Sequence, residues 1–317
     1  MRHLIAALVL LLVAAFGVSG CSGTSQSPRA TAPTTASASR QTVLPFTGLE
    51  TPGDLAVDAA GNVYVTDTHQ VKVDNGFPNV TTRVIKLPAG SNAQTVLPQF
   101  VQSQLTTDPA GAVWVIDTGN EKLVKLAAGT DTQTVLPLPQ PDPSLRGGVL
   151  AIDAAGNAYG LYGGGVFPDG GCCVPIQVMK SEVGSRAPTL LPFTNILFAD
   201  EVALDAAGNV YVGDRNQVLK LAPGADTQTV LPLKLNTAMS GPGPHSVLTG
   251  MAVDSAGNVY VVDADQKQVL KLPAGADAPI VLPFTGLKEP VKVAVDAAGN
   301  VYVTDIDSHQ VLKLAAA

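Results

Sequence analysis

Short runs in which apolar and polar residues alternate recur along the chain, and each is bounded by Gly, Pro, Asn or Asp. Residues 58–67 read Asp-Ala-Ala-Gly-Asn-Val-Tyr-Val-Thr-Asp, and related segments return at intervals of about 42 to 52 residues. β-branched residues in period-two alternation favour strands, and Asp-x-x-Gly-Asn is typical of a tight turn. The repeats begin at Asp58, Asp108, Asp153, Asp205, Asp254 and Asp296.

Each repeat contains four predicted strands. The first is the apolar run before the aspartate, as at 55–57, and the second is the Val-Tyr-Val segment after the turn. The third is Gln-Val-Leu-Lys-Leu or a variant, as at 217–221, and the fourth is Gln-Thr-Val-Leu-Pro or a variant, as at 228–232. Four strands in a repeat of this length predict one blade of a β-propeller.

The two ends of the repeat array predict how the ring closes. A strand of the fourth type stands alone at 41–45, and the last repeat stops after its third strand at Leu314. A closed ring leaves no unpaired blade edge. We therefore expect an all-β, six-bladed propeller over residues 41–317, in which the N-terminal strand completes the last blade.

The N-terminus reads as a targeting segment. Arg2 precedes an apolar run that ends in Val18-Ser19-Gly20-Cys21, which resembles a bacterial lipobox. We expect residues 1–20 to be a lipoprotein signal peptide and Cys21 to carry the lipid, with an ordinary secretory signal as the alternative. Residues 21–40, rich in Ser, Thr, Pro and Ala, are expected to form a flexible tether. The propeller is then anchored to the cell membrane on its extracytoplasmic side.

The repeat resembles the NHL repeat, because the turn and Val-Tyr-Val segment are followed by His-Gln-Val-Leu-Lys-Leu, as at 309–314. It is similar to the extracellular sensor propeller of actinobacterial receptor Ser/Thr protein kinases of the D type. The resemblance covers nearly all of the chain after residue 40. It implies an envelope-exposed binding propeller, and without a kinase domain we expect no signalling output of its own.

Composition narrows the function further. The net charge is -7 and no basic stripe is present, so nucleic acid is not an expected partner. The chain contains no Gly-x-Ser-x-Gly segment, which leaves nucleophilic hydrolysis without a motif. We expect no cofactor and assign no metal site.

Three series of residues recur by blade and are expected to be structural; the second of them is missing from blade three. The aspartates that begin the repeats should cap turns, and a second aspartate series should close the second strand, where a ligand could also reach it. An aromatic series should pack between blades. The second aspartates are Asp67, Asp117, Asp214, Asp263 and Asp305. The aromatic residues are Tyr64, Trp114, Tyr159, Tyr211, Tyr260 and Tyr302.

The long connections all fall on one predicted face of the ring, at 68–81, 138–148, 162–175 and 233–247. Because loops on a rigid scaffold often carry function, we expect this looped face to bind the ligand. The candidate ligand-binding residues are His69, Arg146, Asp169, Asp200, Glu201, Arg215, His245 and His309. The adjacent Cys172 and Cys173 form a vicinal disulfide, remain free thiols or pair between molecules.

Two functions follow from this reading. The first is a non-catalytic lipoprotein whose looped face binds an envelope protein, a glycan or a small ligand. The second is a metal-dependent propeller enzyme of the lyase or lactonase type, which needs acidic and His side chains to converge. The enzymatic function requires at least three side chains of the following group to lie within ligand distance of one point, and the binding function does not. That group is His69, Asp200, Glu201, His245 and His309.

Overall fold

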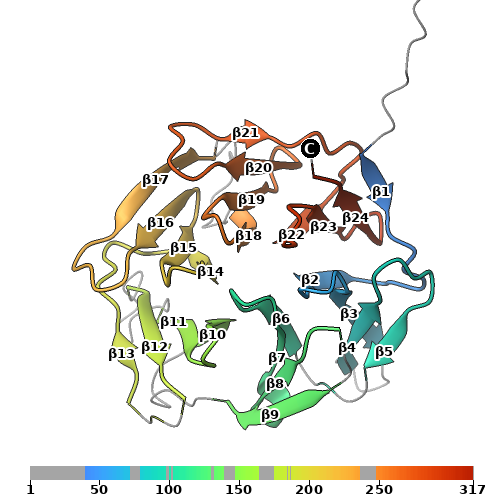
Figure 1. The fold of residues 1–317 in the computed structure, drawn as a ribbon, viewed down its shortest axis with the longest axis horizontal. Helices are drawn as coiled ribbons and strands as arrows, with labels where there is room; N and C mark the ends of the chain where they lie inside the picture. The colour runs from blue at the N-terminus through green and yellow to red at the C-terminus, as the bar shows by residue number, and fades with distance from the viewer. Residues whose placement is uncertain are drawn as a thin grey trace, which may run out of the picture. The chain divides into compact units, whose positions relative to one another are not determined.

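Six antiparallel sheets of four strands surround a central axis in the part of the chain that the computed structural model describes (Figure 1). Each sheet is one blade, so the predicted all-β, six-bladed propeller is confirmed. The described residues are 40–71, 79–97, 100, 103–129, 132–138, 147–163, 175–183, 185, 187–235 and 248–316.

Each blade runs from an inner strand beside the axis to an outer strand at the rim (Figure 1). The inner strands are β2 (Pro52–Val57), β6 (Ser103–Thr107), β10 (Gly147–Ile152), β14 (Ala199–Leu204), β18 (Leu248–Val253) and β22 (Pro290–Val295). The second strands are β3 (Val63–Val71), β7 (Val113–Asp117), β11 (Ala158–Tyr162), β15 (Val210–Asp214), β19 (Val259–Asp263) and β23 (Val301–Asp305).

The outer half of each blade is formed by the two remaining strands. The third strands are β4 (Asn79–Leu87), β8 (Lys122–Leu126), β12 (Gln177–Ser181), β16 (Gln217–Leu221), β20 (Gln268–Leu272) and β24 (Gln310–Leu314). The outer strands are β5 (Thr95–Leu97), β9 (Gln133–Pro137), β13 (Thr189–Leu190), β17 (Thr229–Lys234), β21 (Ile280–Val281) and, for the last blade, β1 (Gln41–Val43). A single 3₁₀ turn, Thr118–Asn120, joins β7 to β8 within the described range.

The predicted closure by the N-terminal strand is also confirmed. Strand β1 pairs antiparallel with β24, with Gln41 opposite Leu314, and places the two ends of the ring in one sheet. The Gln41 side chain accepts a hydrogen bond from the Thr285 backbone N–H at 2.8 Å and donates one to the Thr285 carbonyl at 2.9 Å. This two-point contact ties the closing strand to the end of blade five.

The same clasp recurs around the rim and explains the Gln of the fourth-strand motif. Gln94 makes the equivalent pair of bonds to Thr47, at 2.8 and 2.9 Å. Gln228 makes them to Thr194, at 2.9 and 2.8 Å. In each clasp, a Gln beside or within an outer strand bonds to a Thr that follows the outer strand of the preceding blade. The clasp therefore links neighbouring blades.

The repeated turn aspartates cap their turns, as predicted. In blade four, Asp205 Oδ1 accepts the backbone N–H groups of Ala207 and Asn209 at 3.0 and 2.9 Å. Its Oδ2 accepts the Asn209 side-chain amide at 2.6 Å and the Tyr211 hydroxyl at 2.9 Å. The Lys220 ammonium lies 5.2 Å from the Tyr211 ring centre, which is within cation–π range. One carboxylate therefore organises the turn, the aromatic residue and the third strand.

The aromatic series packs between blades, as expected. Tyr64 of blade one is buried against Leu105 and Val113 of blade two. Tyr211 of blade four is buried against Leu248 and Met251 of blade five. Each blade thus buries an apolar face on its neighbour, and the core is continuous around the ring.

One predicted loop is partly strand. Residues 68–81 were expected to form a connection, but β3 continues to Val71 and β4 begins at Asn79, with Thr68 opposite Thr82. Alternating Thr, Val and polar residues allow the hairpin to extend past the level at which the other blades turn. Blade one therefore carries a longer hairpin on the looped face than the prediction gave it.

The expected signal peptide at 1–20 and, apart from Arg40, the tether at 21–40 lie outside the described residues. Among the described residues, no helix is long and apolar enough to cross a membrane.

Removal of the closing strand should weaken the ring. A chain that begins at Phe46 lacks β1 and the Gln41 clasp, and it leaves the edge of β24 unpaired. We expect this truncation to lower the free energy of unfolding by roughly 2–4 kcal/mol and to promote self-association through the open edge. Denaturant titration and sedimentation velocity measure both effects. A chain that begins at Arg40 is the control, and equal stability and equal sedimentation of the two chains would contradict this account of closure.

Candidate functional site

A cavity of about 640 Å³ occupies the centre of the ring. The six inner strands line it, together with the turns that carry the first aspartate in every blade but blade three. Each inner strand pairs with a neighbour on one side only, so its other edge faces the axis (Figure 1). The wall of the cavity is therefore made partly of backbone N–H and C=O groups at strand edges.

One position of the inner strand gives the cavity its charge. It lies four residues before each turn aspartate and differs in every blade. In blade order it is occupied by Asp54, Gln104, Val149, Glu201, Gly250 and Lys292. Four of these, Asp54, Gln104, Glu201 and Lys292, line the cavity.

The Lys292 side chain forms a bridge across the cavity. Its ammonium Nζ donates a hydrogen bond to Glu201 Oε1 and forms an ion pair with it. The same Nζ lies 3.7 Å from Asp54 Oδ1. The side chains of Lys292, Asp54 and Glu201 are 30%, 20% and 12% exposed. We call these three residues the charged bridge; it joins blades one, four and six.

A glycine in blade five makes room for this arrangement. A Cβ at Gly250 would lie 2.6 Å from the Val291 carbonyl oxygen and 2.8 Å from Lys292 Cα. Such distances are too short for real atoms, so only glycine lets β18 and β22 approach this closely. Blade five also presents no side chain at the level where Lys292 passes to reach blade four.

The charged bridge lies at the inner end of the cavity. The turns line one end of the cavity, and the charged positions lie four residues further along the strands, roughly 13 Å from the turns at strand spacing. The next residues, Gly53, Asp200 and Val291, are not part of the lining. We call the bridge the floor of the cavity, whose described walls lead from the bridge to the face with the Asp-x-x-Gly turns, opposite the looped face.

Burial and pairing set the charges of the floor. Burial raises the pKa of Glu201 to about 7, and the nearby Lys292 ammonium opposes that rise. Burial lowers the pKa of Lys292, but attraction to Glu201 and Asp54 outweighs it and holds the pKa above its ordinary value. Lys292 is therefore charged at neutral pH, and its contact with Glu201 favours the ionised carboxylate against the effect of burial.

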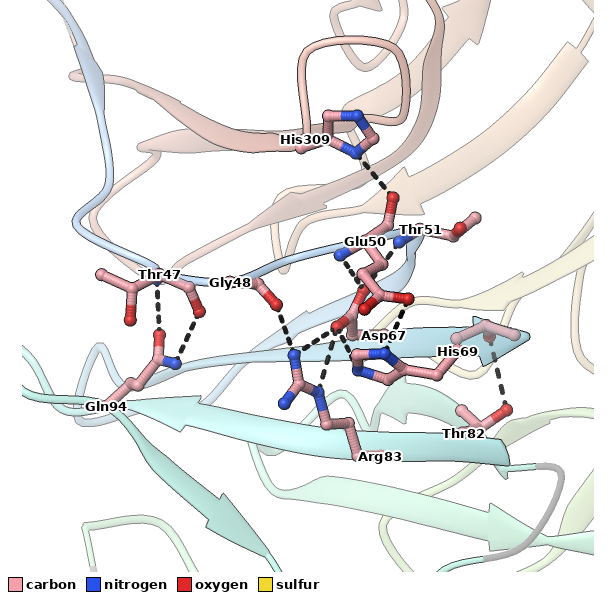
Figure 2. Close-up of polar contacts among 11 residues, drawn as sticks. Thr47, Gly48, Glu50, Thr51, Asp67, His69, Thr82, Arg83, Gln94 and His309 are labelled. Carbon is pink, nitrogen blue, oxygen red and sulfur yellow. Dashed lines mark hydrogen bonds and ion pairs between the residues drawn. The ribbon is translucent and has the colours of Figure 1, made fainter. Parts of the chain in front are cut away.

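Two of the three predicted histidines, His69 and His309, lie on the other face and come together around Glu50 (Figure 2). His69 Nδ1 lies 2.7 Å from Glu50 Oε2, and His69 Nε2 lies 3.2 Å from Asp67 Oδ2. His309 Nδ1 lies 2.6 Å from the Glu50 carbonyl oxygen. Blades one and six are neighbours through closure, which explains this meeting of residues far apart in the chain.

Asp67 is the centre of this second cluster (Figure 2). Its buried carboxylate accepts the Glu50 and Thr51 backbone N–H groups at 2.9 and 2.8 Å. Arg83 donates to Asp67 Oδ2 through Nε at 3.0 Å and through a terminal nitrogen at 2.7 Å, and also donates to the Gly48 carbonyl. The cluster holds the connection between β1 and β2 against blade one.

Other members of the second aspartate series also have structural roles. Asp214 accepts the Phe198 backbone N–H at 2.8 Å, and Asp305 accepts that of Lys288 at 2.7 Å. The Gln of the third-strand motif supports the carboxylate, as Gln268 does for Asp263 at 3.0 Å. Blade one replaces this Gln with Arg83. The structural interpretation of the series is therefore confirmed where these contacts are described.

The remaining candidates are dispersed. Arg215 stacks over the Phe198 ring at 4.9 Å, Asp200 is exposed, and Glu201 belongs to the charged bridge and not to the looped face. Among the described residues, no group of three or more His, Cys, Asp or Glu is placed to hold a metal ion. Outside the described residues lie Cys21, Arg146, Asp169, Cys172, Cys173 and His245.

The sequence analysis missed Asp54, Gln104 and Lys292. Each lies just before, or at the start of, the apolar run in its own blade and was not singled out. A pattern that could have found them is variation within the repeat, because this position holds an acid, an amide, valine, glycine or lysine, whereas the residue after it is always apolar.

Known proteins share the fold and a short stretch of sequence. No protein-family model matches the chain. A stretch of 64 residues, 19% of the chain, is 48% identical to serine/threonine-protein kinase PknD of Mycobacterium tuberculosis, and it spans only 8% of that kinase. Two enzymes have a similar fold. A gluconolactonase from Xanthomonas campestris gives a TM-score of 0.58 at 12% identity, over 87% of this chain and 89% of that one. A catalytically inactive virginiamycin B lyase from Staphylococcus aureus with quinupristin gives 0.51 at 14% identity, over 87% and 85%. At these identities the likeness shows the propeller fold alone.

Asp67→Asn should destabilise the protein more than loss of the neighbouring histidine. The amide keeps the size of the carboxylate but removes the charge that Arg83 pairs with. We expect the free energy of unfolding to fall by about 2 kcal/mol, because Arg83 is partly exposed and regains some hydration. His69→Gln should cost under about 1 kcal/mol. Denaturant titrations compare the two, and an equal or larger cost for His69→Gln would contradict the central role of Asp67.

Lys292→Met should destabilise the protein in a pH-dependent way. Without the ammonium, Asp54 and Glu201 face each other, and the pKa of Glu201 rises further. A carboxyl whose pKa is raised by folding favours the folded state at low pH and loses that contribution as pH rises through the folded pKa. We expect a cost of about 3 kcal/mol at about pH 8 and a smaller cost at about pH 5. Denaturant titration at both pH values measures this cost. A larger loss of stability at the lower pH would contradict the pairing of Lys292 with Glu201 and Asp54.

Proposed function

We propose that this protein is a membrane-anchored, extracytoplasmic binding protein whose propeller holds a small polar ligand, or one end of a larger one, in the central cavity without chemical turnover. The observation that carries the proposal is the charged bridge of Lys292, Glu201 and Asp54 at the floor of a cavity of about 640 Å³. The sequence analysis expected the ligand on the looped face, whereas this proposal places it in the central cavity.

The size and construction of the cavity support ligand binding. Small-molecule sites in proteins are commonly clefts of about 300–1,000 Å³ with a few fixed polar groups. Here the polar groups come from inner strands that pack against their neighbours, as β18 does against β22 and β2 against β22. Side chains on strands are held more firmly than side chains on loops, which lowers the cost of ordering them when a ligand binds.

The proposed location rests on the N-terminal sequence. Val18-Ser19-Gly20-Cys21 follows an apolar run and offers a thiol at the position where lipoproteins carry their acyl chains. A diacyl anchor would hold the propeller at the membrane, with the tether at 21–40 as a spacer. In that setting an envelope protein or an envelope glycan is the proposed partner.

Glu201 favours a second function, an enzyme of the lactonase or lyase type. A carboxyl with a pKa of about 7 beside a lysine, inside a cavity, is suited to proton transfer near neutral pH. The similar folds include a gluconolactonase and a virginiamycin B lyase. In this alternative Glu201 would act as the general acid or base, and Lys292 would stabilise developing negative charge.

Blocking the cavity tests the proposed binding site. Gln104→Trp places a large side chain among the residues that line the cavity, whereas Gln266→Trp makes the same change at an exposed position of the looped face. We screen a library of small polar fragments by ligand-observed NMR. We expect the fragments that bind the unmodified chain to lose binding in Gln104→Trp, by roughly tenfold or more, and to keep it in Gln266→Trp.

The reverse pattern would contradict the cavity as the binding site and would favour the looped face. Turnover is measured in the same samples with gluconolactone, by following acid release. No acceleration over the buffer rate supports the binding function. Acceleration that Glu201→Gln abolishes would contradict it and would establish the enzymatic alternative.

A further inference from the structure

We propose that the floor of the cavity selects a neutral, hydroxyl-rich ligand, such as a terminal sugar residue, over ligands that carry a net charge. This inference rests on the proposed function, because it names the ligand class of the same cavity. Its basis is the alternation of two carboxylates and one ammonium at Asp54, Lys292 and Glu201.

The alternating charges disfavour either kind of ion. A ligand cation that approaches Asp54 or Glu201 meets the Lys292 ammonium, which lies 3.7 Å from Asp54 and in direct contact with Glu201. A ligand anion that approaches Lys292 meets two carboxylates. Like charges at such distances repel strongly in a partly buried site. A hydroxyl group avoids both conflicts, because it donates to a carboxylate and accepts from an ammonium.

The bridge also keeps hydrogen-bonding capacity for a ligand. A carboxylate offers about four acceptor positions, and an ammonium offers three donors. Asp54 Oδ1 lies 3.7 Å from Lys292 Nζ, which is beyond hydrogen-bond distance, and Asp54 Oδ2 accepts a long bond of 3.4 Å from the Leu105 backbone. The Asp54 carboxylate is therefore able to accept hydrogen bonds from the hydroxyl groups of a ligand.

The walls add neutral polar groups between the bridge and the turns, whose lining aspartates accept hydrogen bonds within their own turns, as Asp58 and Asp205 do. Gln104 and Thr106 line the cavity and supply an amide and a hydroxyl. The edges of the inner strands supply backbone donors and acceptors without charge. This combination matches vicinal hydroxyl groups, each of which acts as both donor and acceptor.

The position of the bridge also favours a ligand that inserts the end of a polymer into the cavity over a polymer that passes through the ring. Lys292 spans the cavity from blade six to blade four, so a polymer that entered from the turn face would meet the bridge at the floor. A terminal sugar residue reaches the floor without passing it. An extended peptide would need the bridge to open, which separates a partly buried ion pair.

Three matched sugars test the selection by charge. Glucose, glucosamine and gluconate share most of their hydroxyl groups but are neutral, cationic and anionic at neutral pH. Galactose, mannose and N-acetylglucosamine widen the neutral set. We titrate each into the full chain and measure affinity by ligand-observed NMR. We expect at least one neutral sugar to bind roughly tenfold more tightly than both glucosamine and gluconate.

Charge variants of the bridge should shift the preference in opposite directions. Glu201→Gln removes one negative charge and should raise the affinity for gluconate relative to glucose. Lys292→Gln removes the positive charge and should raise the affinity for glucosamine relative to glucose. Each shift should be several-fold, as expected for one charge in a partly solvated site. Glu182→Gln, the same change at a residue 62% exposed outside the cavity lining, is the control and should change neither ratio.

The ranking in the unmodified chain does not depend on any variant, so a variant that unfolds leaves the test intact. Tighter binding of glucosamine or gluconate than of every neutral sugar would overturn the selection for a neutral ligand. Binding of none of the neutral sugars would overturn it as well. In both cases the fragment screen with Gln104→Trp still decides separately whether the cavity binds ligands at all.

Discussion

The cavity exists only while the blades form a closed ring, and closure depends on the pairing of β1 with β24. This pairing joins Gln41 to Leu314 and lets one sheet contain both ends of the ring. Closure also brings blade six beside blade one, so Lys292 and Asp54 line the same cavity and His309 meets Glu50 on the opposite face. The candidate site and the looped-face cluster are thus both consequences of one strand pairing.

Some carboxylates of low exposure stabilise the fold, whereas others form the candidate site, and their burial alone does not distinguish the two groups. Asp67 and the turn aspartates accept backbone N–H groups at one oxygen and side-chain donors at the other, so their charge stabilises the fold. Glu201 and Asp54 instead share a lysine across an open cavity, where hydrogen-bonding capacity remains. The difference lies in the partners: backbone groups of the turn or connection together with nearby side chains in the first case, and one side chain of a different blade in the second.

The fold could be predicted because each blade repeats the same local rules. The Asp-x-x-Gly-Asn turn and the aromatic residue two positions after the Asn lie within one repeat and need no knowledge of distant contacts. The Gln clasp was not predicted, because it joins residues that are far apart in the sequence, such as Gln41 and Thr285. The site could not be predicted in this way. Asp54, Glu201 and Lys292 occupy one repeat position but different blades, and only ring geometry brings them together. His69 was expected to bind a ligand, yet its Nδ1 lies 2.7 Å from Glu50, and its Nε2 is buried 3.2 Å from Asp67 without a hydrogen-bond partner among the described residues.

Backbone hydrogen exchange with a bound neutral sugar tests most directly where the ligand lies. If the cavity is the binding site, protection should increase in the inner strands at Gln104, Glu201 and Lys292, and in the adjacent Asp-x-x-Gly turns. The turns of the looped face at Arg215, Lys267 and His309 should exchange as before. Protection confined to those turns, with the inner strands unchanged, would contradict the central claim that this propeller binds its ligand at the charged floor of the ring.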